Sequence, residues 1–188
     1  MRISGGQARG IPLLVPGGDS VRPATDSLRQ AVFSSLAARV PGTRFLDLFA
    51  GSGAYGLEAL SRGAVGGVFV ESSHKAAGCL RKNLAAVCKS LGRDEAELHL
   101  LEIDATTVPL GGSVLPDLVF IDPPYEMAGQ IALGLFVKLT EILAGNPEAL
   151  VVFEIPGEVE LAPPGWTCLR RLGKKGFRQP NAAIFRRS

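Results

Sequence analysis

The chain has few of the residues that build disulfide frameworks or metal sites. Its 188 residues include only three cysteines, two histidines and one tryptophan. The cysteines are Cys79, Cys88 and Cys168, and no two of them form a C-x-x-C pair. This spacing argues against a zinc site and a disulfide framework. We therefore expect reduced thiols that act as core residues, no bound metal and a cytoplasmic location.

Long hydrophobic runs are also missing. No apolar stretch reaches the ~18 residues of a transmembrane helix, and residues 1–6 lack the apolar core of a signal peptide. We expect no membrane partner. Hydrophobic residues still make up 46% of the chain, which is enough for a packed core. The length predicts one domain, 1–188, with a basic N-terminal arm and helix in 1–40 and a catalytic core in 41–188.

Acidic residues are absent from the C-terminal segment 161–188, which carries a net charge of +7. Residues 1–40 carry +3, whereas residues 41–160 carry −8. Basic ends around an acidic centre indicate a polyanionic partner, although solvated surface charge is the alternative interpretation. The candidate phosphate contacts are Arg2, Arg9, Arg22, Lys174, Lys175 and Arg178.

Apolar runs alternate with helical patterns through the middle of the chain. The expected strands are 45–49, 67–71, 98–101, 118–121 and 150–153, and the expected helices start at 25 or 26, 57, 73 and 131. This alternation predicts an α/β fold with a mostly parallel sheet. Residues 166–172 and 182–185 predict antiparallel strands at the end of the sheet. Residues 1–24 predict a short hairpin-like arm.

A glycine-rich turn follows the first expected strand. Residues 51–56 match G-x-G-x-x-G between a strand and a helix, and Glu71 lies twenty residues after Gly51. Glycines let the backbone approach a ligand, and the acid can accept hydrogen bonds from ribose hydroxyls. We expect Gly51, Ser52, Gly53 and Glu71 to bind a nucleoside-containing cofactor, with NAD and S-adenosylmethionine both possible. A turn needed only for close packing is the alternative.

The segment Asp122-Pro123-Pro124-Tyr125 ends the fourth expected strand. Prolines carry no N–H group, so this turn offers mainly hydrogen-bond acceptors beside an aromatic ring. That combination suits a planar amine, whose N–H groups need acceptors and whose ring can stack. We expect these four residues to be catalytic and Asp122 also to adjoin the cofactor. An ordinary turn is the alternative.

Two further acids favour S-adenosylmethionine over NAD. Asp47 lies in the strand before the glycine turn, where a carboxylate could meet a cationic amino group and would repel a pyrophosphate. Asp104 follows the third strand and could reach an adenine amino group, or be an ordinary loop residue. A planar amine beside a sulfonium methyl group is an arrangement for methyl transfer.

The motifs together resemble class I amino-methyltransferases, and nearly the whole chain is similar to the RsmD-like 16S ribosomal RNA guanine-N2 methyltransferases. The resemblance rests on residues 2–6, 9–10, 22–26, 29, 33, 47–53, 56–62, 71 and 122–125. It implies a Rossmann-like core and S-adenosylmethionine as the cofactor. It also implies a guanine N2 amine in 16S rRNA, within the small subunit or an assembly intermediate, as the substrate. Arg29, one of the matching residues, joins the expected RNA contacts.

Other functions share some of these features. A DNA or other RNA amino-methyltransferase, acting on adenine N6 or cytosine N4, would contain the same Asp122–Tyr125 turn, but the chain leaves little room for a target-recognition domain. An NAD-dependent oxidoreductase would give that turn no role. A non-catalytic RNA-binding module is a third alternative. We expect a monomer by default.

Overall fold

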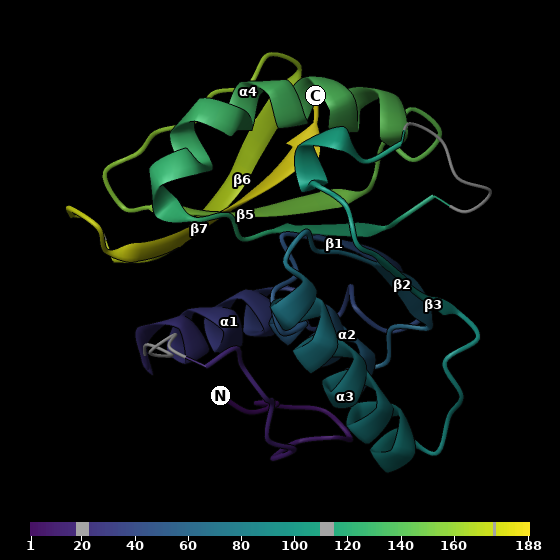
Figure 1. The fold of residues 1–188 in the computed structure, drawn as a ribbon. Coiled ribbons are helices and arrows are strands. Elements are labelled where there is room, and N and C mark those ends of the chain that lie inside the picture. Colours follow the sequence, from purple (N-terminus) through teal and green to yellow (C-terminus); the bar gives the residue numbers. More distant parts are fainter. Residues whose placement is uncertain (18–22, 110–114, 175) are drawn as a thin grey trace.

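The fold has three layers, with one mixed sheet between two layers of helices. We describe it from a computed structural model that places residues 1–17, 23–109, 115–174 and 176–188. Within these residues, seven strands form the sheet in the order β3-β2-β1-β4-β5-β7-β6. Figure 1 shows the sheet running through the middle of the molecule, with helices on both faces. The predicted α/β fold is confirmed.

Five strands of the sheet are parallel. They are β1 (Arg44–Leu48), β2 (Gly66–Val70), β3 (Leu98–Leu101), β4 (Leu118–Ile121) and β5 (Leu150–Pro156). Strand β7 (Pro180–Arg187) pairs antiparallel with both β5 and β6 (Trp166–Gly173). Each strand overlaps a segment predicted from an apolar run. Helices on both faces explain why β4 and β5 are buried along their whole length.

The helices divide between the two faces of the sheet. Helices α1 (Pro23–Ser35), α2 (Ala54–Ser61) and α3 (His74–Leu91) lie below the sheet in Figure 1. Helix α4 (Tyr125–Ile142) and the short 3-10 helix η1 (Ala105–Thr107) lie above it. The Oγ atom of Ser73 accepts the N–H of Ala76 and caps α3. None of the described helices is long and apolar enough to cross a membrane.

Helix α4 begins six residues earlier than predicted, at Tyr125 rather than at Ile131. The two prolines explain the difference, because a proline pair ends a strand and fits the entry to a helix. The carbonyl of Pro124 accepts the N–H of Ala128 at 3.2 Å and closes the first helical turn. Tyr125 therefore stands on the first turn of a regular helix rather than in a loop. Helix α1 likewise begins earlier than predicted, at Pro23.

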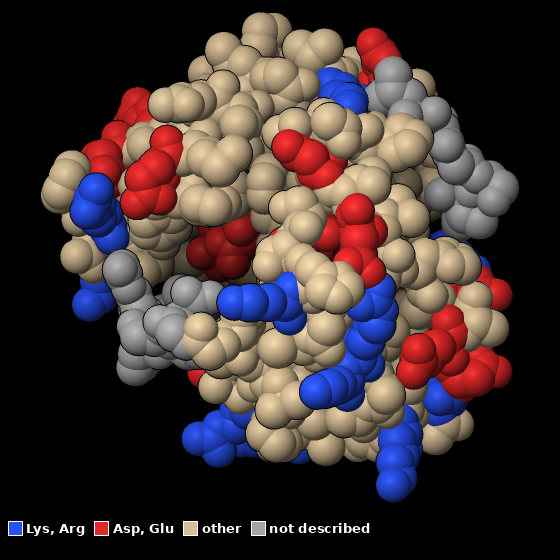
Figure 2. All heavy atoms as spheres, in the orientation of Figure 1, with Lys and Arg blue, Asp and Glu red and all other residues tan. Residues whose placement is uncertain are grey.

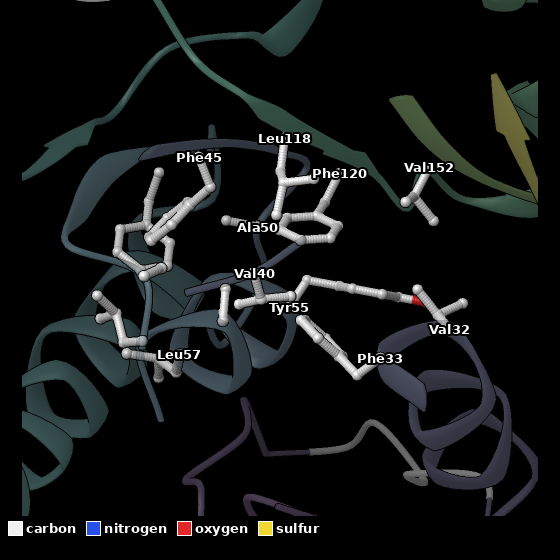
Figure 3. Packing of buried hydrophobic residues seen from close by; sticks show 14 of the residues in the cluster. Val32, Phe33, Val40, Phe45, Ala50, Tyr55, Leu57, Leu118, Phe120 and Val152 are labelled. Atoms are coloured by element: carbon white, nitrogen blue, oxygen red, sulfur yellow. The ribbon is translucent and has the colours of Figure 1, made fainter. Parts of the chain in front are cut away.

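An aromatic cluster joins α1 and α2 to the lower face of the sheet. The ring of Tyr55 lies between Phe33 of α1 and Phe120 of β4 (Figure 3), with centroid distances of 6.0 and 5.2 Å. All three residues are at least 96% buried. Close packing of this kind leaves a side chain few rotamers. The cluster therefore fixes where the hydroxyl group of Tyr55 points.

The N-terminal arm, residues 1–17, packs against α2. The backbone N–H of Ser4 and its hydroxyl group each donate a hydrogen bond of 2.7 Å to the buried carboxylate of Glu58. Gly6 lies so close to α2 that a Cβ atom there would be 1.9 Å from the carbonyl oxygen of Ser61. The expected hairpin-like arm is confirmed by an antiparallel bridge between Arg2 and Pro12 and by backbone hydrogen bonds from Ile3 to Ile11 at 2.9 Å and from Leu13 to Met1 at 3.1 Å. These backbone hydrogen bonds and the contacts with α2 together hold the arm.

Candidate active site

A cleft of about 880 Å³ opens at the carboxyl ends of the parallel strands. Ligands of open α/β sheets bind at this edge, and small-molecule sites occupy about 300–1,000 Å³. Figure 2 shows acidic atoms recessed in a hollow of the surface. The lining residues come from the N-terminal arm, the glycine turn, the start of α3 and the ends of β4 and β5. The fold thus brings segments from most of the chain to one site.

The glycine turn forms one wall of the cleft. Gly51 and Gly53 have φ angles of +55° and +87°, which glycine adopts without strain. A Cβ atom on Gly51 would meet no atom within 4 Å, so the backbone there faces open space. Glu71 holds the turn, because its two oxygens accept the N–H groups of Gly51 at 2.8 Å and Ser73 at 2.6 Å. Ser52 and Glu71 also line the cleft.

Asp47 lies beneath the glycine turn rather than on the cleft wall. Its carboxylate is 1% exposed and accepts the N–H of Gly56 at 2.9 Å. Among the described residues, those that line the cleft do not include Asp47. Burial raises the pKa of Asp47 to about 8, an effect that the Gly56 hydrogen bond partly offsets. The geometry assigns Asp47 to the support of the turn.

The Asp122–Tyr125 turn forms a second part of the cleft wall. All four residues line the same cleft as Gly51 and Ser52. The N–H of Asp122 donates to the carbonyl of Leu48 at 3.4 Å, which ties the turn to β1. Because neither proline has an N–H group, the wall presents acceptors next to the ring of Tyr125. An acceptor-rich turn and a glycine turn thus share one cleft.

Glu154 completes the floor of the cleft, and our sequence analysis missed it. Ile121 of β4 pairs in parallel register with Phe153 of β5, so Asp122 and Glu154 come next on neighbouring strands and lie on the same face. Glu154 is 2% exposed, and the hydroxyl group of Tyr55 donates a hydrogen bond to it. An acid at the end of an apolar strand identified Asp122. The same signal applied to Glu154 would have found it.

Burial raises the pKa values of both neighbouring carboxyl groups. Although Asp122 is open to the cleft on one side, loss of hydration raises its pKa to about 6, while a hydrogen bond with Glu154 and the charge of Arg29 lower it. Burial raises the pKa of Glu154 well above its usual range, and repulsion from Asp122 adds to this effect. The pKa of the enclosed Glu154 is therefore raised well above its usual range, whereas that of Asp122, which is open to the cleft, is raised to about 6.

Residues 1–185 match the family described as "Conserved hypothetical protein 95". The chain belongs to this family. Ribosomal RNA small subunit methyltransferase D of Escherichia coli K12 is 34% identical over 176 residues, which cover 90% of this chain and 83% of that protein. The protein of the same name from Haemophilus influenzae is 32% identical over 174 residues, covering 90% and 86%. The family resemblance predicted from the sequence is confirmed.

Solved structures agree with this membership. The structure of yhhF from Escherichia coli is 32% identical and superposes with a TM-score of 0.76, covering 100% of this chain and 98% of that chain. The crystal structure of SMU.776 complexed with SAH has a TM-score of 0.69 over 89% of this chain and 51% of that chain. At 15% identity the second likeness shows the fold alone. The Rossmann-like methyltransferase fold is thereby confirmed for this family member.

The structure corrects the expected role of Arg29. Its side chain is 2% exposed and lies in the wall of the cleft, so it is not on the surface where RNA phosphates would bind. Its guanidinium group pairs with Asp26 at 3.1 Å and Glu58 at 3.6 Å and donates to the carbonyl of Arg2 at 2.8 Å. Arg29 joins α1, α2 and the N-terminal arm.

The other expected RNA contacts are on the surface or outside the described residues. Arg2, Arg9, Lys174 and Arg178 are exposed. Arg178 also lines a smaller pocket of about 340 Å³ that shares Tyr125 with the main cleft. Arg22 and Lys175 lie outside the described residues.

Asp104 forms hydrogen bonds within its own loop. Its Oδ1 atom accepts hydrogen bonds of 2.7 and 2.8 Å from the N–H and hydroxyl groups of Thr106, which cap η1 and lower the pKa of Asp104. It is not among the described residues that line the cleft. The described part of the chain contains no group of three or more His, Cys, Asp or Glu side chains that could hold a metal ion.

Proposed function

We propose that this protein transfers a methyl group from S-adenosylmethionine to the exocyclic N2 amine of a guanine in 16S ribosomal RNA. The observation that carries this proposal is that the Asp122–Tyr125 turn and the glycine turn line one cleft. The named function of two relatives, which cover 90% of the chain, supports ribosomal RNA of the small subunit as the substrate. The choice of guanine N2 rests on the family resemblance.

The glycine turn and Glu71 suit S-adenosylmethionine. When bound, this cofactor supplies a methyl group on a positively charged sulfur atom. The open backbone at Gly51 would allow close approach of the cofactor, and Ser52 and Gly53 complete this turn. The Glu71 carboxylate uses one site on each oxygen for backbone N–H groups. Because a carboxylate accepts about four hydrogen bonds, Glu71 retains capacity for ribose hydroxyls. Asp47 supports the turn from beneath.

The Asp122–Tyr125 turn would hold the target base. The Asp122 carboxylate and the Pro123 carbonyl would accept the two N–H bonds of the amine, because the Pro124 carbonyl is used by α4. Two such acceptors favour a pyramidal nitrogen and aim its lone pair at the methyl group. Tyr125 would stack on the base, which is worth about 1–3 kcal/mol. Fixing both reactants supplies much of the rate acceleration.

Proton removal follows bond formation. As the nitrogen bonds to the methyl carbon, the carbon–sulfur bond breaks and its electron pair remains on sulfur. The methylated nitrogen then carries an extra proton and a positive charge. Asp122, ionised at neutral pH, is placed to accept that proton. The base must leave its stack to reach the cleft.

The surface beside the cleft supports an RNA substrate. The turn between β6 and β7 carries Phe177, which is 76% exposed, between the exposed residues Lys174 and Arg178. Basic groups bind phosphates, and an exposed ring is a stacking platform for an unpaired base. Arg178 adjoins the pocket that contains Tyr125, so this turn can reach the same RNA strand. Arg2 and Arg9 would contribute from the N-terminal arm.

One labelling experiment tests the function. The protein is incubated with methyl-labelled S-adenosylmethionine and, separately, undermethylated small subunits, naked 16S rRNA and duplex DNA, and the label is mapped. We expect label on one guanine N2 of 16S rRNA. Label on adenine N6 or cytosine N4 would overturn the guanine assignment, and label on DNA would overturn the RNA assignment. No transfer to any substrate, with cofactor binding intact, would favour a non-catalytic RNA-binding module.

The cellular setting is part of the proposal. We propose that the protein acts in the cytoplasm as a monomer, on the small subunit or an assembly intermediate, with residues 1–188 working as one domain. The comparison of intact subunits with naked RNA in the labelling experiment distinguishes the two forms of the substrate. Light scattering of the purified protein tests the monomer.

A further inference from the structure

The floor of the cleft contains a chain of three polar groups from three elements. Asp122 ends β4, Glu154 belongs to β5, and Tyr55 projects from α2. The hydroxyl group of Tyr55 donates to Oε1 of Glu154, and the register between β4 and β5 places Glu154 beside Asp122 on the same face of the sheet. Two carboxyl groups form a hydrogen bond only when one of them carries a proton. A hydrogen bond between Asp122 and Glu154 therefore needs one proton on the pair.

The two members of the pair have different surroundings. Glu154 is enclosed, at 2% exposed, whereas Asp122 opens onto the cleft where the target amine would bind. A charge is more costly in the enclosed position, because burial removes hydration that the protein does not replace. The proton is therefore held by Glu154, whose O–H group donates to Asp122.

We propose that Glu154 is a positioning residue that stays protonated and, held by Tyr55, orients the ionised Asp122 toward the substrate amine. This inference rests on the proposed function for its substrate, but the proton arrangement is a property of the protein alone. The Glu154 hydrogen bond occupies one lone-pair site of Asp122 and leaves the others for the amine. It also makes Asp122 less basic, so that Asp122 remains an ionised acceptor at neutral pH.

Charged and titratable groups from three neighbouring elements affect the titration of Asp122 and Glu154. The charged and titratable groups that face it are Tyr55 from α2, Arg29 from α1 and Asp47 from β1. On the β7 side, the register partner of Glu154 is Ala182, which does not titrate. Arg29 favours the ionised form of Asp122, while Asp47 is itself kept neutral by burial below about pH 8. These groups therefore keep a single negative charge, on Asp122, at neutral pH.

Carbon-13 NMR of the cofactor-free protein tests the proton arrangement directly. Carboxyl signals of Asp122 and Glu154 are followed from pH 4 to 9 in the wild type and in Glu154→Gln. We expect Asp122 to titrate near 6, Glu154 to remain protonated at neutral pH, and Glu154→Gln to leave the Asp122 pKa within about half a unit. The glutamine amide can donate to Asp122 and its oxygen can accept from Tyr55. A Glu154 signal that is ionised at pH 7 would overturn the proposal.

Matched variants distinguish the hydrogen bond from simple charge removal. Glu126→Gln removes a negative charge from the same cleft and should leave the Asp122 titration unchanged. Glu154→Leu removes the donor and should raise the Asp122 pKa by a unit or more. If Glu154→Leu does not fold, the Glu154→Gln titration still decides the question, because an Asp122 shift above one unit there contradicts the proposal.

Kinetics test the role in catalysis. We expect Glu154→Gln to keep kcat within about threefold of wild type. In the pH–rate profile, the fall of kcat on the acid side should stay near pH 6. Glu154→Leu should lower kcat at pH 7, because the acid-side fall of the pH–rate profile moves to a higher pH. The kcat value should recover when the pH is raised further. A Glu154→Gln variant as inactive as Asp122→Asn would show that Glu154 acts as an ionised base and overturn the inference. If neither wild type nor variants methylate RNA while the NMR titrations agree, the proposed function fails and the proton arrangement stands.

Discussion

At the scale of single residues, three acids meet at the carboxyl ends of β1, β4 and β5. Their different burial gives them different pKa values and therefore different roles. Asp47 and Glu154 are almost fully enclosed, whereas Asp122 faces the cleft. Enclosure raises the pKa of both inner acids above that of Asp122, so they hold protons when Asp122 has lost its own. Because their pKa values differ, Asp122 can accept hydrogen bonds and a proton as a carboxylate, while Asp47 and Glu154 support the site as neutral acids.

Replacing Asp122 tests the acceptor. Asp122→Asn removes the negative charge but keeps the size of the side chain, so kcat should fall by about 10²–10⁴. Cofactor affinity, measured by calorimetry, should remain within a few fold. Glu141→Gln, exposed on the last part of α4, serves as the control and should keep normal turnover. Near-normal kcat of Asp122→Asn would exclude Asp122 as the acceptor.

Burial of Asp47 predicts a pH dependence of stability. Its pKa is about 8 in the folded protein and about 3.9 in an unfolded chain, so the folded state binds the extra proton between these values. This contribution to stability is complete below about pH 4 and is lost as pH rises toward 8. Its slope is at most about 1.4 kcal/mol per pH unit. Asp47→Asn should flatten the decline in urea-unfolding free energy from pH 6 to 8.

The control for that measurement is Asp104→Asn. The pKa of Asp104 is lowered by its hydrogen bonds to Thr106, so its contribution is lost only as pH falls into the acid range. The variant should leave the slope between pH 6 and 8 as in wild type. Equal slopes for Asp47→Asn and wild type would mean that Asp47 is not protonated in the folded state.

At the scale of elements, turns and caps decide where the functional groups stand. The proline pair places Tyr125 on the first turn of α4, and the glycine turn opens the backbone at Gly51. The N-terminal arm reaches the cleft because Glu58 and Ser61 of α2 hold it through hydrogen bonds and a close backbone approach. The support of the site thus depends on short segments outside the sheet.

Two glycines of the arm give a matched pair. Gly6 and Gly10 have φ angles of +77° and +93°, but only Gly6 is crowded, since a Cβ atom on Gly10 would meet nothing within 4 Å. Gly10→Ala should cost about 1–2 kcal/mol through backbone strain. Gly6→Ala should cost about 1–3 kcal/mol more, because the methyl group meets α2. Equal urea midpoints for the two variants would show that the arm is not packed against α2.

The basic turn between β6 and β7 predicts a salt dependence. Replacing Lys174 and Arg178 together by alanine removes two expected phosphate contacts. The slope of log affinity against log salt for single-stranded RNA should become shallower by about 0.7 per contact, or about 1.4 in total. Lys89→Ala, exposed on α3, is the control and should keep the wild-type slope. An unchanged slope for the double variant would remove this turn from the RNA-binding surface.

At the scale of the whole molecule, the parallel sheet assembles a site from distant segments. The strand order β2-β1-β4-β5 brings Glu71, the glycine turn, Asp122 and Glu154 to the same edge. Chain connections of a parallel sheet cross over its faces, so consecutive carboxyl ends collect on one side. The cleft therefore exists only when the sheet is complete, and a ligand that bridges its walls should stabilise the entire fold.

Ligand binding should therefore appear as thermal stabilisation. S-adenosylhomocysteine at one hundred times its Kd should add about 2.7 kcal/mol of stability. For a chain of this length, that gain corresponds to a rise in Tm on the order of 5–10 °C. NAD at the same concentration should give no shift if the cleft is specific for S-adenosyl compounds. A shift with NAD alone would favour the oxidoreductase.

The sequence by itself determined the local structure and the two motifs. Apolar runs located the strands, and glycine and proline marked the turns, because these preferences act within a few residues. The Asp122–Tyr125 turn and Glu71 were recognisable as candidates because each follows such a run. The early starts of α1 and α4 were missed, since prolines that end one element can also begin the next.

Only the tertiary structure decided which side chains face one another. The pairing of Asp122 with Glu154 depends on the register between β4 and β5, and the hydrogen bond from Tyr55 depends on how α2 packs beneath them. The burial of Arg29 depends in the same way on α1, α2 and the N-terminal arm meeting at Glu58. Register and packing arise from contacts between segments far apart in the chain. Local preferences therefore revealed the Asp122–Tyr125 turn. The protonation of Glu154 instead follows from its burial by segments that are far apart in the chain.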